Sequence, residues 1–469
     1  MTAEAKQRLK YVVSDYITSG IALLVFNIFR YYTLDLSRLG LRGVENYIFQ
    51  RQLIAETWLL PIIMLGVYWL SGYYNHPFNK SRLQELVTTM ASAIINTLLF
   101  FLIFLTNDMG KLLTTNFYLL VVLGSLLFLL PYSGRWMLTS MSIRKIKRHQ
   151  ISFKTLIIGN SASAHHTADS LRNSVALMGY DVVGFVDIPG ETKYDTKGIS
   201  FIDIEKKAVE LGVSQIIISP DSFDDVRLLD LLSRLYTLPV SVKIAPATFS
   251  YVTYGIHLND IYGEPLVELS SPRISESTKN IKRTIDVLFS GVTMILLSPV
   301  YALTALAVRI SSPGPIIYRQ TRIGLRRKPF EILKFRTMHV NAEVNGPALS
   351  SAQDPRVTKV GAFLRKYRLD EIPQFWNVFK GEMSIVGPRP EREYFIRQIV
   401  KEAPYYNMIH QVRPGITSWG MVKFGYASNI PDMVRRAQFD LVYLQNMSIL
   451  VDCKIIIYTI KTVLSGLGV

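Results

Sequence analysis

Two adjacent carboxylates, Asp370 and Glu371, are the side chains of this sequence most suited to chemistry. They open the stretch RLDEIPQFWNVFKGEMSIVGPRPER (residues 368–392), in which an apolar run leads to a Gly-Pro-Arg-Pro turn. Within about a turn and a half of helix before Asp370 lie three cations, Arg365, Lys366 and Arg368. We expect these cations to keep the Asp370 carboxylate ionised and to let a phosphate approach it.

A structural explanation of the acid pair is also open. Pro373 falls in the first turn of a plausible helix, and acidic side chains stabilise that end of a helix. A binding or catalytic role therefore needs support from other motifs.

A strongly basic segment precedes the acid pair. Residues 309–338 read RISSPGPIIYRQTRIGLRRKPFEILKFRTM and contain little acid. One interpretation is a surface that binds lipid headgroups. Lys334 and Arg336, however, lie two residues apart on an apolar, strand-like run, where buried cations require anionic partners. We therefore expect substrate contacts from Arg319, Lys334 and Arg336.

An apolar run from Ile285 to Val308 precedes the basic segment and decides the topology. About 24 helical residues are long enough to cross a bilayer, which is the simplest interpretation. Pro299 predicts a sharp bend, because its ring clashes with the carbonyl of Ile295, and Ser298 can bond the carbonyls that are freed. Basic residues at both ends suit a helix that dips into one leaflet and returns. On these grounds alone, crossing and re-entry are equally open.

Composition narrows the class of protein. The 469 residues are enough for two or three domains, and a hydrophobic content of 49% disfavours a wholly soluble chain. The net charge of +16 suits anionic lipids or phosphorylated substrates, and no compact nucleic-acid motif accompanies it. Cys453 is the only cysteine, which excludes an internal disulfide and a thiolate metal cluster. We expect no nucleic-acid partner.

The first third of the chain has the pattern of membrane helices. Four apolar runs are present: Tyr16–Phe29, Trp58–Trp69, Val87–Leu105 and Phe117–Tyr132. Several are shorter than the roughly 20 residues of a straight span, and the second is the weakest, but flanking tyrosines can extend them. Lys and Arg residues place both ends of this region on the cytoplasmic side, although the first loop is also basic.

From Lys154 onward strands alternate with helices, which predicts a parallel, Rossmann-like sheet. The apolar runs are TLIIG, YDVVGFVD, SQIIISP and VSVKIA, with helical patterns such as DIEKKAVELG between them. The dinucleotide fingerprint is incomplete, because Asn160, Ser161 and Ala164 follow Gly159 where glycines are needed. A structural or regulatory domain is therefore favoured over a nucleotide site.

The C-terminal motifs resemble those of bacterial sugar transferases. KRTID, Ser298-Pro299, GPIIYRQTRIG, KFRTM, LDEIPQFWNVFKGEMSIVGPRP and RPGIT follow one another in the order found in that family. The resemblance covers about Lys279 to the C-terminus, and the upstream part looks like the long form of the family. Its members are monotopic phosphoglycosyl transferases, which pass a hexose-1-phosphate from a UDP-sugar to a polyprenyl phosphate and so initiate exopolysaccharide assembly.

The resemblance implies roles for matching residues. Asp370 would attack the sugar-proximal phosphorus and expel UMP, leaving a covalent aspartyl-phosphosugar. Glu371 would hold Mg²⁺ and assist the second step, and Arg365 would hold a phosphate. The uridine phosphate would meet a rigid turn made of Pro388, Arg389 and Pro390. A re-entrant helix would be capped at the membrane interface by Lys282, Arg283 and Asp286.

Two segments depart from the family pattern. Tyr367 and Arg368 precede the acid pair where many members carry small hydroxyl residues. After RPGIT this chain has SWGMVKFGY in place of a commoner Gly-Trp-Ala-Gln-Val run. Both segments are placed to touch the nucleotide or the sugar, so the resemblance does not identify the sugar.

In the C-terminal tail, apolar and polar residues alternate at helical spacing. It reads MVRRAQFDLVYLQNMSILVDCKIIIYTIKTVL. It suits either an interfacial helix or a buried core helix. In the first case four cations would lie at headgroup level: Arg435, Arg436, Lys454 and Lys461.

These features predict a multi-pass bacterial inner-membrane protein of mixed α and α/β class. Its expected parts are a four-helix transmembrane region (1–150), a Rossmann-like domain (151–272) and a mainly helical, monotopic catalytic domain (279–469) with a re-entrant helix (282–309). Because UDP-sugars are cytoplasmic, the catalytic domain is expected on the cytoplasmic face of the lipid bilayer, which favours re-entry. By resemblance we also expect a homodimer.

Two other functions are compatible with parts of the sequence. A nucleotide-sensing membrane scaffold would use the Rossmann-like domain and leave the C-terminal domain inactive, but the acid pair and its arginines are intact. A sugar-modifying oxidoreductase would need the missing glycines and a Tyr-x-x-x-Lys pair, which that region lacks.

Overall fold

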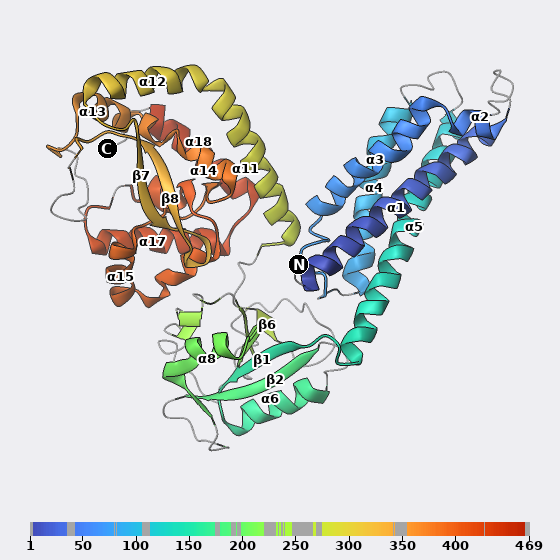
Figure 1. The fold of residues 1–469 in the computed structure, drawn as a ribbon, viewed down its shortest axis with the longest axis horizontal. Helices are drawn as coiled ribbons and strands as arrows, with labels where there is room; N and C mark the ends of the chain where they lie inside the picture. Colours follow the sequence, from blue (N-terminus) through green and yellow to red (C-terminus); the bar gives the residue numbers. More distant parts are fainter. Residues whose placement is uncertain are drawn as a thin grey trace. The chain divides into compact units, whose positions relative to one another are not determined.

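The computed structural model describes residues 3–34, 43–78, 80, 82–105, 113–173, 179–188, 194, 198–219, 231–232, 234–235, 238, 240–245, 266–268, 274–340, 342, 354–425 and 427–464. The chain divides into two compact units, which are described separately. The first contains Met1–Ser152, Ser174–Gly179 and Ser275–Ile281, and the second contains Phe153–Asn173, Tyr180–Ile274 and Lys282–Val469 (Figure 1).

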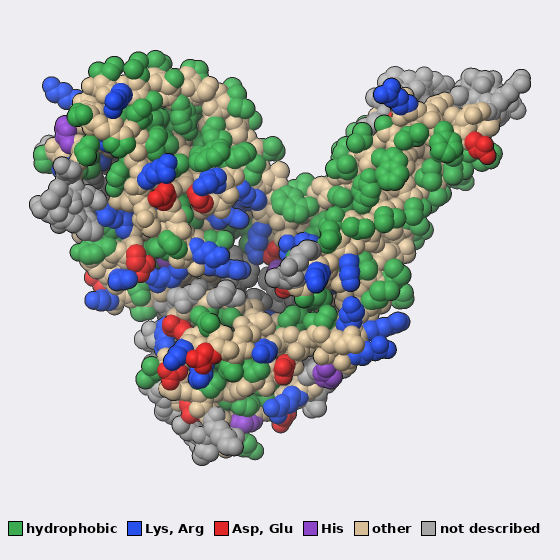
Figure 2. Space-filling view, in the orientation of Figure 1, with side chains coloured by type: hydrophobic (Ala, Val, Ile, Leu, Met, Phe, Trp, Pro, Cys, Tyr) green, Lys and Arg blue, Asp and Glu red, His purple; other side chains and the backbone are tan. Residues whose placement is uncertain are grey.

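The first unit is a bundle of long apolar helices. Its helices are α1 (Ala3–Thr33), the short α2 (Val44–Ile48), α3 (Arg51–Leu70), α4 (Arg82–Leu105) and α5 (Leu113–Lys147). Among the described residues, α1, α3, α4 and α5 are each long and apolar enough to cross a membrane. This confirms four long apolar helices where four were expected, and the second is also long enough to span. Figure 2 shows hydrophobic side chains over the visible face of this bundle. Trp58, Ile62 and Leu98 are among its exposed large hydrophobic residues.

A charged network lies inside the bundle. The fully buried Arg135 guanidinium donates two hydrogen bonds to Asp15, Nε to Oδ1 at 2.9 Å and Nη2 to Oδ2 at 2.7 Å, and a third to Thr89 Oγ1 at 2.8 Å. The buried Glu85 accepts a hydrogen bond of 2.7 Å from the Tyr73 hydroxyl. Opposite charges at such depth are stable only when they are paired. The network therefore fixes how α1, α4 and α5 pack together.

The second unit begins with an α/β sheet. Its strands are β1 (Phe153–Ile158), β2 (Tyr180–Asp187), β3 (Ile199–Ser200), β4 (Gln215–Ile218), β5 (Ser241–Ile244) and β6 (Val267–Glu268). They lie in the order β3-β2-β1-β4-β5-β6, all parallel except β6. Helices α6 (Ala162–Asn173) and α8 (Ile204–Glu210) and the 3₁₀ turn η2 (Phe201–Asp203) connect them. The parallel sheet is confirmed, and its order follows that of doubly wound domains.

Side chains of the domain bond one another at the carboxyl ends of β1 and β2. Asn160 Nδ2 donates to Asp187 Oδ1 at 2.8 Å, and its Oδ1 lies 3.0 Å from His165 Nε2. Gly159 has φ +118°, and a Cβ there would lie 2.4 Å from the Ser219 carbonyl oxygen. Doubly wound domains place a dinucleotide at this edge of the sheet. At this edge Asn160, Asp187 and His165 thus contact one another.

Two helices with a bend between them begin the C-terminal part of the chain. Helix α11 (Glu276–Leu296) and helix α12 (Ser298–Ser311) meet at 64° (Figure 1). Ser298 Oγ donates to the Ile295 carbonyl at 2.8 Å, and Pro299 occupies the first turn of α12. The predicted bend is therefore confirmed. Large apolar side chains on both helices are exposed, among them Ile295 and Ile310.

The remainder is mainly helical around two small sheets. The antiparallel hairpin joins β7 (Ile317–Ile323) and β8 (Pro329–Phe335) through η3 (Leu325–Arg327), and β9 (Ser384–Val386) pairs in parallel with β10 (Gly415–Thr417). Its helices are α13 (Lys359–Lys366), α14 (Gln374–Lys380), α15 (Glu393–Glu402), α16 (Trp419–Lys423), α17 (Ile430–Gln445) and α18 (Ile449–Leu464). Two 3₁₀ segments complete it, η4 (Leu369–Glu371) and η5 (Pro404–Gln411).

Contacts from α11 attach it to this core. Asp286 Oδ1 accepts a 3.0 Å hydrogen bond from the backbone N–H of Ile385 in β9. Arg283 donates to the carbonyls at the end of α14, and Lys282 pairs with Asp452 of α18. The three charged residues of the KRTID motif thus bond to protein groups in the same unit.

The tail forms two helices rather than one, with a break at 446–448. Helix α17 is packed into the core, whereas α18 exposes Leu450 and Ile457. Of the two interpretations of the tail, the buried core helix applies at Arg436, because its side chain is buried and Nη2 donates to Glu391 Oε1 at 2.6 Å. The two interpretations of the tail therefore apply to different helices.

Candidate active site

The acid pair lies in a tight turn between α13 and α14. Arg368 has φ +53° and ψ +24°, a left-handed conformation that costs a non-glycine residue about 1 kcal/mol. The chain then makes the 3₁₀ turn η4, which ends at Glu371, before α14 starts at Gln374. The two acids thus precede α14 in a turn of their own. Both side chains point inward, Asp370 being 8% exposed and Glu371 7%.

Glu371 is surrounded by three cations. Its Oε1 lies 2.9 Å from Lys334 Nζ and 3.5 Å from Arg389 Nη2, and its Oε2 lies 3.2 Å from Arg368 Nη1. Burial opposes ionisation, but Lys334, Arg389 and Arg368 together hold the pKa of Glu371 well below its usual range. Glu371 is therefore a permanent anion that positions three cations.

Asp370 behaves differently from its neighbour. Burial, together with the adjacent Glu371 charge, raises the pKa of Asp370 to about 6, although Lys334, Arg365 and Arg368 act in the opposite direction. At pH 7 roughly ten Asp370 side chains are then ionised for each one protonated. Asp370 is therefore mostly ionised at neutral pH, as predicted. Its pKa nevertheless lies close to neutral pH, and its carboxylate is poorly solvated because it is buried. A poorly solvated carboxylate is a more reactive nucleophile than one exposed to water.

Arg365 reaches the site from α13. Its Nε donates to Thr337 Oγ1 at 2.9 Å, and Thr337 directly follows the KFR sequence of the hairpin. Helix α13 can come this close because a Cβ at Gly361 would lie only 2.0 Å from the Thr337 carbonyl oxygen. The cap of α13 is the Thr358 side chain, which accepts from the Gly361 N–H at 2.9 Å.

The Pro-Arg-Pro turn follows β9 and brings Arg389 to the acid pair. Its guanidinium donates to Met421 Sδ at 3.1 Å as well as to Glu371, so Met421 of the SWGMVKFGY segment touches the site. The Pro388 carbonyl accepts from the Gly415 N–H at 2.9 Å, and the Pro390 carbonyl accepts from Arg322 at 3.1 Å. Both ends of the turn are therefore held by the rest of the protein.

Buried charges that the sequence analysis missed support this turn. Glu391 lies between two arginines, 3.1 Å from Arg322 Nη1 and 2.6 Å from Arg436 Nη2. Asp440 accepts a 2.8 Å hydrogen bond from the Gly420 N–H, and burial raises its pKa to about 6. Glu391 adjoins the GPRP motif, and that position was the only sequence signal that pointed to it.

The other predicted residues fall in two groups. Lys334, Arg365 and Arg389 lie at or next to the acid pair. Arg336 donates to the carbonyls of Ser312 and Pro313 at 2.6 and 3.0 Å, which secures the end of α12. Arg319 is exposed and lies 3.6 Å from Glu331 across the hairpin. The contacts of these last two residues thus do not include the acid pair.

Among the residues that the structure describes, the carboxylates available to Mg²⁺ at this site are those of the acid pair. Among the described residues no group of three or more His, Cys, Asp or Glu side chains is placed to hold a metal ion. Magnesium commonly uses only one or two carboxylates together with phosphate oxygens. Glu371 Oε2 accepts one hydrogen bond, from Arg368, and an oxygen of this kind has two lone pairs. The residues present therefore fit a magnesium ion shared with a substrate phosphate.

Comparison with known proteins points to one family. The family model described as "Bacterial sugar transferase" matches residues 277–466. A UDP-glucose:undecaprenyl-phosphate glucose-1-phosphate transferase of Escherichia coli (strain K12) is 35% identical over 65% of this chain and 66% of its own length. A UDP-N-acetylgalactosamine-undecaprenyl-phosphate N-acetylgalactosaminephosphotransferase of Aeromonas hydrophila is 43% identical over 40% of this chain and 44% of its own.

A third relative is matched over most of its length. It is a UDP-glucose:undecaprenyl-phosphate glucose-1-phosphate transferase of Caulobacter vibrioides, 39% identical over 41% of this chain and 73% of its own. For the first two relatives the match spans less than two thirds of their length. The names of the three specify two sugars, glucose for the first and third relatives and N-acetylgalactosamine for the second, so the similarity does not identify the sugar.

Proposed function

The chain belongs to the bacterial sugar transferase family, and on that premise we propose that it transfers a hexose-1-phosphate from a UDP-sugar to a polyprenyl phosphate such as undecaprenyl phosphate. The observation that carries the proposal is the unequal acid pair. Asp370 is buried with a raised pKa, whereas the neighbouring Glu371 is fixed as an anion by three cations. That arrangement provides one reactive carboxylate in a strongly cationic site.

In the first step Asp370 attacks the sugar-proximal phosphorus of the UDP-sugar. An oxygen–phosphorus bond forms to the carboxylate, the bond between that phosphorus and the bridging oxygen breaks, and UMP leaves with the electron pair. Lys334 and Arg389 are placed to stabilise the charge that develops on the phosphate oxygens. A carboxylate needs no general base for this attack.

In the second step an oxygen of the polyprenyl phosphate attacks the same phosphorus. The aspartyl–phosphorus bond breaks, Asp370 is released as a carboxylate, and the lipid carries the phosphosugar. Bound at Glu371, Mg²⁺ would neutralise phosphate charge. Arg365 lies beside Asp370 and is suited to hold a phosphate of either substrate.

The bent helix pair supports a membrane location for this chemistry. Helices α11 and α12 expose large apolar side chains on both sides of the 64° bend, which suits a re-entrant segment in one leaflet. We propose that the C-terminal part lies on the cytoplasmic face of the inner membrane, where UDP-sugars are available. A homodimer, expected from the resemblance, stays a prediction.

The test is UMP release from a panel of UDP-sugars with Mg²⁺ and polyprenyl phosphate, by the intact protein and by Asp370→Asn. Without the lipid acceptor, mass spectrometry of the intact protein should reveal one phosphohexose on the chain and none on the variant. The matched control is Asp169→Asn, an exposed aspartate on α6. Equal turnover by the Asp370→Asn variant would contradict the nucleophile, and no turnover with any donor would contradict the function.

A further inference from the structure

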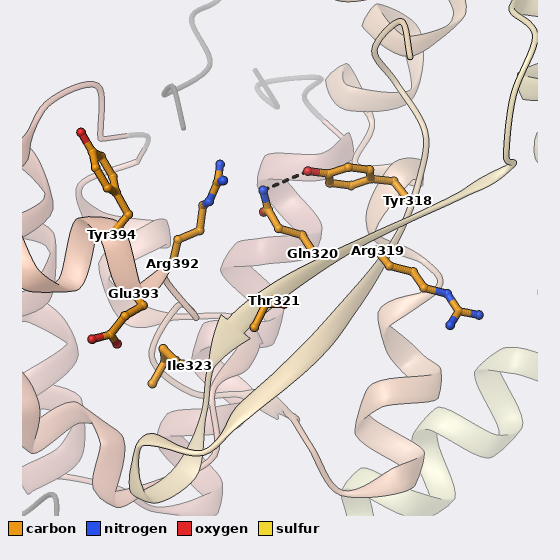
Figure 3. A pocket seen from close by; sticks show the side chains of 8 residues that line it. All are labelled: Tyr318, Arg319, Gln320, Thr321, Ile323, Arg392, Glu393 and Tyr394. Carbon is orange, nitrogen blue, oxygen red and sulfur yellow. Dashed lines mark hydrogen bonds between the residues drawn. The ribbon is translucent and has the colours of Figure 1, made fainter. Parts of the chain in front are cut away.

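A pocket of about 360 Å³ lies between β7 and the start of α15. Figure 3 shows Tyr318 and Gln320 projecting from the strand on one side, and Arg392 and Tyr394 from the start of α15 on the other. Arg319 points from the opposite face of β7 (Figure 3). The volume suits a small ligand or one part of a larger one.

The pocket shares one face of the β7–β8 hairpin with Lys334 of the candidate active site. Tyr318 is directly opposite Lys334 in the hairpin, so both side chains lie on one face of it. Lys334 in turn bonds Glu371. Farther along the same face, Arg322 donates to the Pro390 carbonyl of the turn that bears Arg389. A ligand at the acid pair can therefore extend into this pocket.

The pocket lies away from the apolar helices. The end of the hairpin next to α12 is Ile317 opposite Phe335, whose ring is 5.7 Å from that of Tyr301. The lining residues begin at Tyr318 and continue toward the far end of β7. A polyprenyl chain would approach along α11 and α12, so this polar pocket suits the water-soluble end of the donor.

The orientation of the Gln320 amide is fixed. Arg322 Nε donates to Gln320 Oε1 at 3.0 Å, and arginine is never an acceptor. Gln320 Nε2 then donates to the Tyr318 hydroxyl at 3.0 Å, and the same amide nitrogen carries a second N–H donor. Arg392 adds a guanidinium, another group with donors only. The pocket therefore presents donors, which match a ligand rich in acceptors.

Aromatic faces complete the lining. The side chains of Tyr318 and Tyr394 are 39% and 52% exposed, as platforms for a planar ring would be. The Glu393 carboxylate, also in the lining, is neutralised by Arg327 at 2.8 Å and Arg397 at 3.1 Å. Uracil is planar and carries two carbonyl acceptors, whereas cytosine replaces one of them with an amino donor.

We propose that this pocket holds the uracil and ribose of the UDP-sugar, with Gln320 reading a uracil carbonyl and Tyr394 or Tyr318 stacking on the base. The proposal rests on the proposed function, since it names where the leaving nucleotide is bound. It assigns the pocket to the part of the donor that all UDP-sugars share, and leaves the sugar to other residues.

The experiment is calorimetric binding of UMP and CMP to the full-length protein in detergent, beside transfer assays with several UDP-sugars. For the intact protein, UMP should bind more tightly than CMP. Tyr394→Ala should weaken UMP about 5- to 100-fold. Gln320→Glu replaces a donor by an acceptor and should reduce the preference for UMP over CMP at least tenfold. Both changes should lower kcat/KM for every UDP-sugar by the same factor.

The control is Gln438→Glu, an exposed glutamine on α17, which should leave all these values unchanged. The proposal is overturned if UMP binding is unaffected in folded variants. It is also overturned if the variants alter the ranking of UDP-sugars, since the pocket would then hold the sugar. If the intact protein binds UMP through this pocket but transfers no sugar, the proposed transferase function is contradicted, whereas binding of the nucleoside in this pocket is supported.

Discussion

Lys334 Nζ lies 2.9 Å from Glu371 Oε1 and joins the β7–β8 hairpin to the turn that carries Asp370. The contact links two segments 37 residues apart in the chain. It also lowers the pKa of both acids, so one lysine affects both the anionic partner and the reactive carboxylate.

The first prediction concerns the pH dependence of activity. Because Asp370 has a pKa of about 6 and must be ionised to attack, kcat/KM should rise as pH increases through 6 and level off above about 7. The measurement is UMP release between pH 5 and 8.5 with a stable buffer series. A rate that does not change across that range would contradict an essential carboxylate with this pKa.

Lys334→Met should shift that profile to higher pH. Removing the ammonium eliminates an interaction that lowers the pKa of Asp370, so less of the carboxylate is ionised at any acidic pH. We expect kcat/KM at pH 7 to fall at least about tenfold. Lys380→Met, at an exposed lysine paired with Glu382, is the matched control and should retain the original profile. A loss of rate without a shifted profile would mean that Lys334 acts on substrate alone.

Asp370→Asn should stabilise the fold at neutral pH. The folded-state pKa of about 6 lies above the unfolded value of 3.8, so the native state binds more protons between these values and stability falls as pH rises through that window. Removing the ionised carboxylate should then add on the order of 1–3 kcal/mol at pH 7 and little at pH 4. Thermal unfolding in detergent at pH 7 and pH 4 measures the difference in stability between the variant and the intact protein. A variant that is less stable than the intact protein at pH 7 would contradict the prediction.

The carboxylate oxygen of Asp286, as a hydrogen-bond acceptor, should contribute more to the stability of the fold than its negative charge does. It accepts the backbone N–H of Ile385, so Asp286→Ala leaves a buried donor unpaired and should cost about 1–3 kcal/mol. Asp286→Asn keeps a carbonyl oxygen and should recover most of that loss. Chemical denaturation of the three proteins gives the comparison. If Asn and Ala are equally damaging, the ion pairing near α11 dominates instead.

Cysteine labelling tests the proposed topology. In a Cys453→Ser background, single cysteines at Lys145, at the end of α5, and at Glu402, in α15, occupy exposed positions. If α11 and α12 re-enter, both cysteines should react with an impermeant maleimide only in inverted membrane vesicles. Labelling of the two positions from opposite sides would require the segment to cross.

Local chemistry explains which features could be predicted from the sequence. The bend follows from Pro299, because a proline ring clashes with the carbonyl four residues before it in the same helix, whatever the rest of the fold is. The four membrane helices and the parallel sheet follow from hydrophobic runs long or regular enough to be unambiguous. Lys334 was expected near substrate because a cation on an apolar run needs an anionic partner, and Arg389 because its motif matches that of the family.

The missed features depend on distant partners or on backbone conformation. Arg436 could have lain at the headgroups or in the core, since nothing near it in the chain indicates Glu391, 45 residues away, as its partner. Arg336 has the same spacing pattern as Lys334, yet it bonds carbonyls at the end of α12. The left-handed Arg368 has no glycine to mark it, so the inward turn of the acids was not visible in the sequence.

The pair of Asp15 and Arg135 has a consequence for how the protein is made. The two residues are 120 positions apart, on the first and the last helix of the bundle. A ribosome therefore releases α1 into the membrane long before α5 exists, and the newly inserted helix carries an acid with no cation to meet it. Assembly is complete only when the last helix arrives, so a nascent chain that stops before α5 holds Asp15 in the membrane without its arginine partner, which is costly.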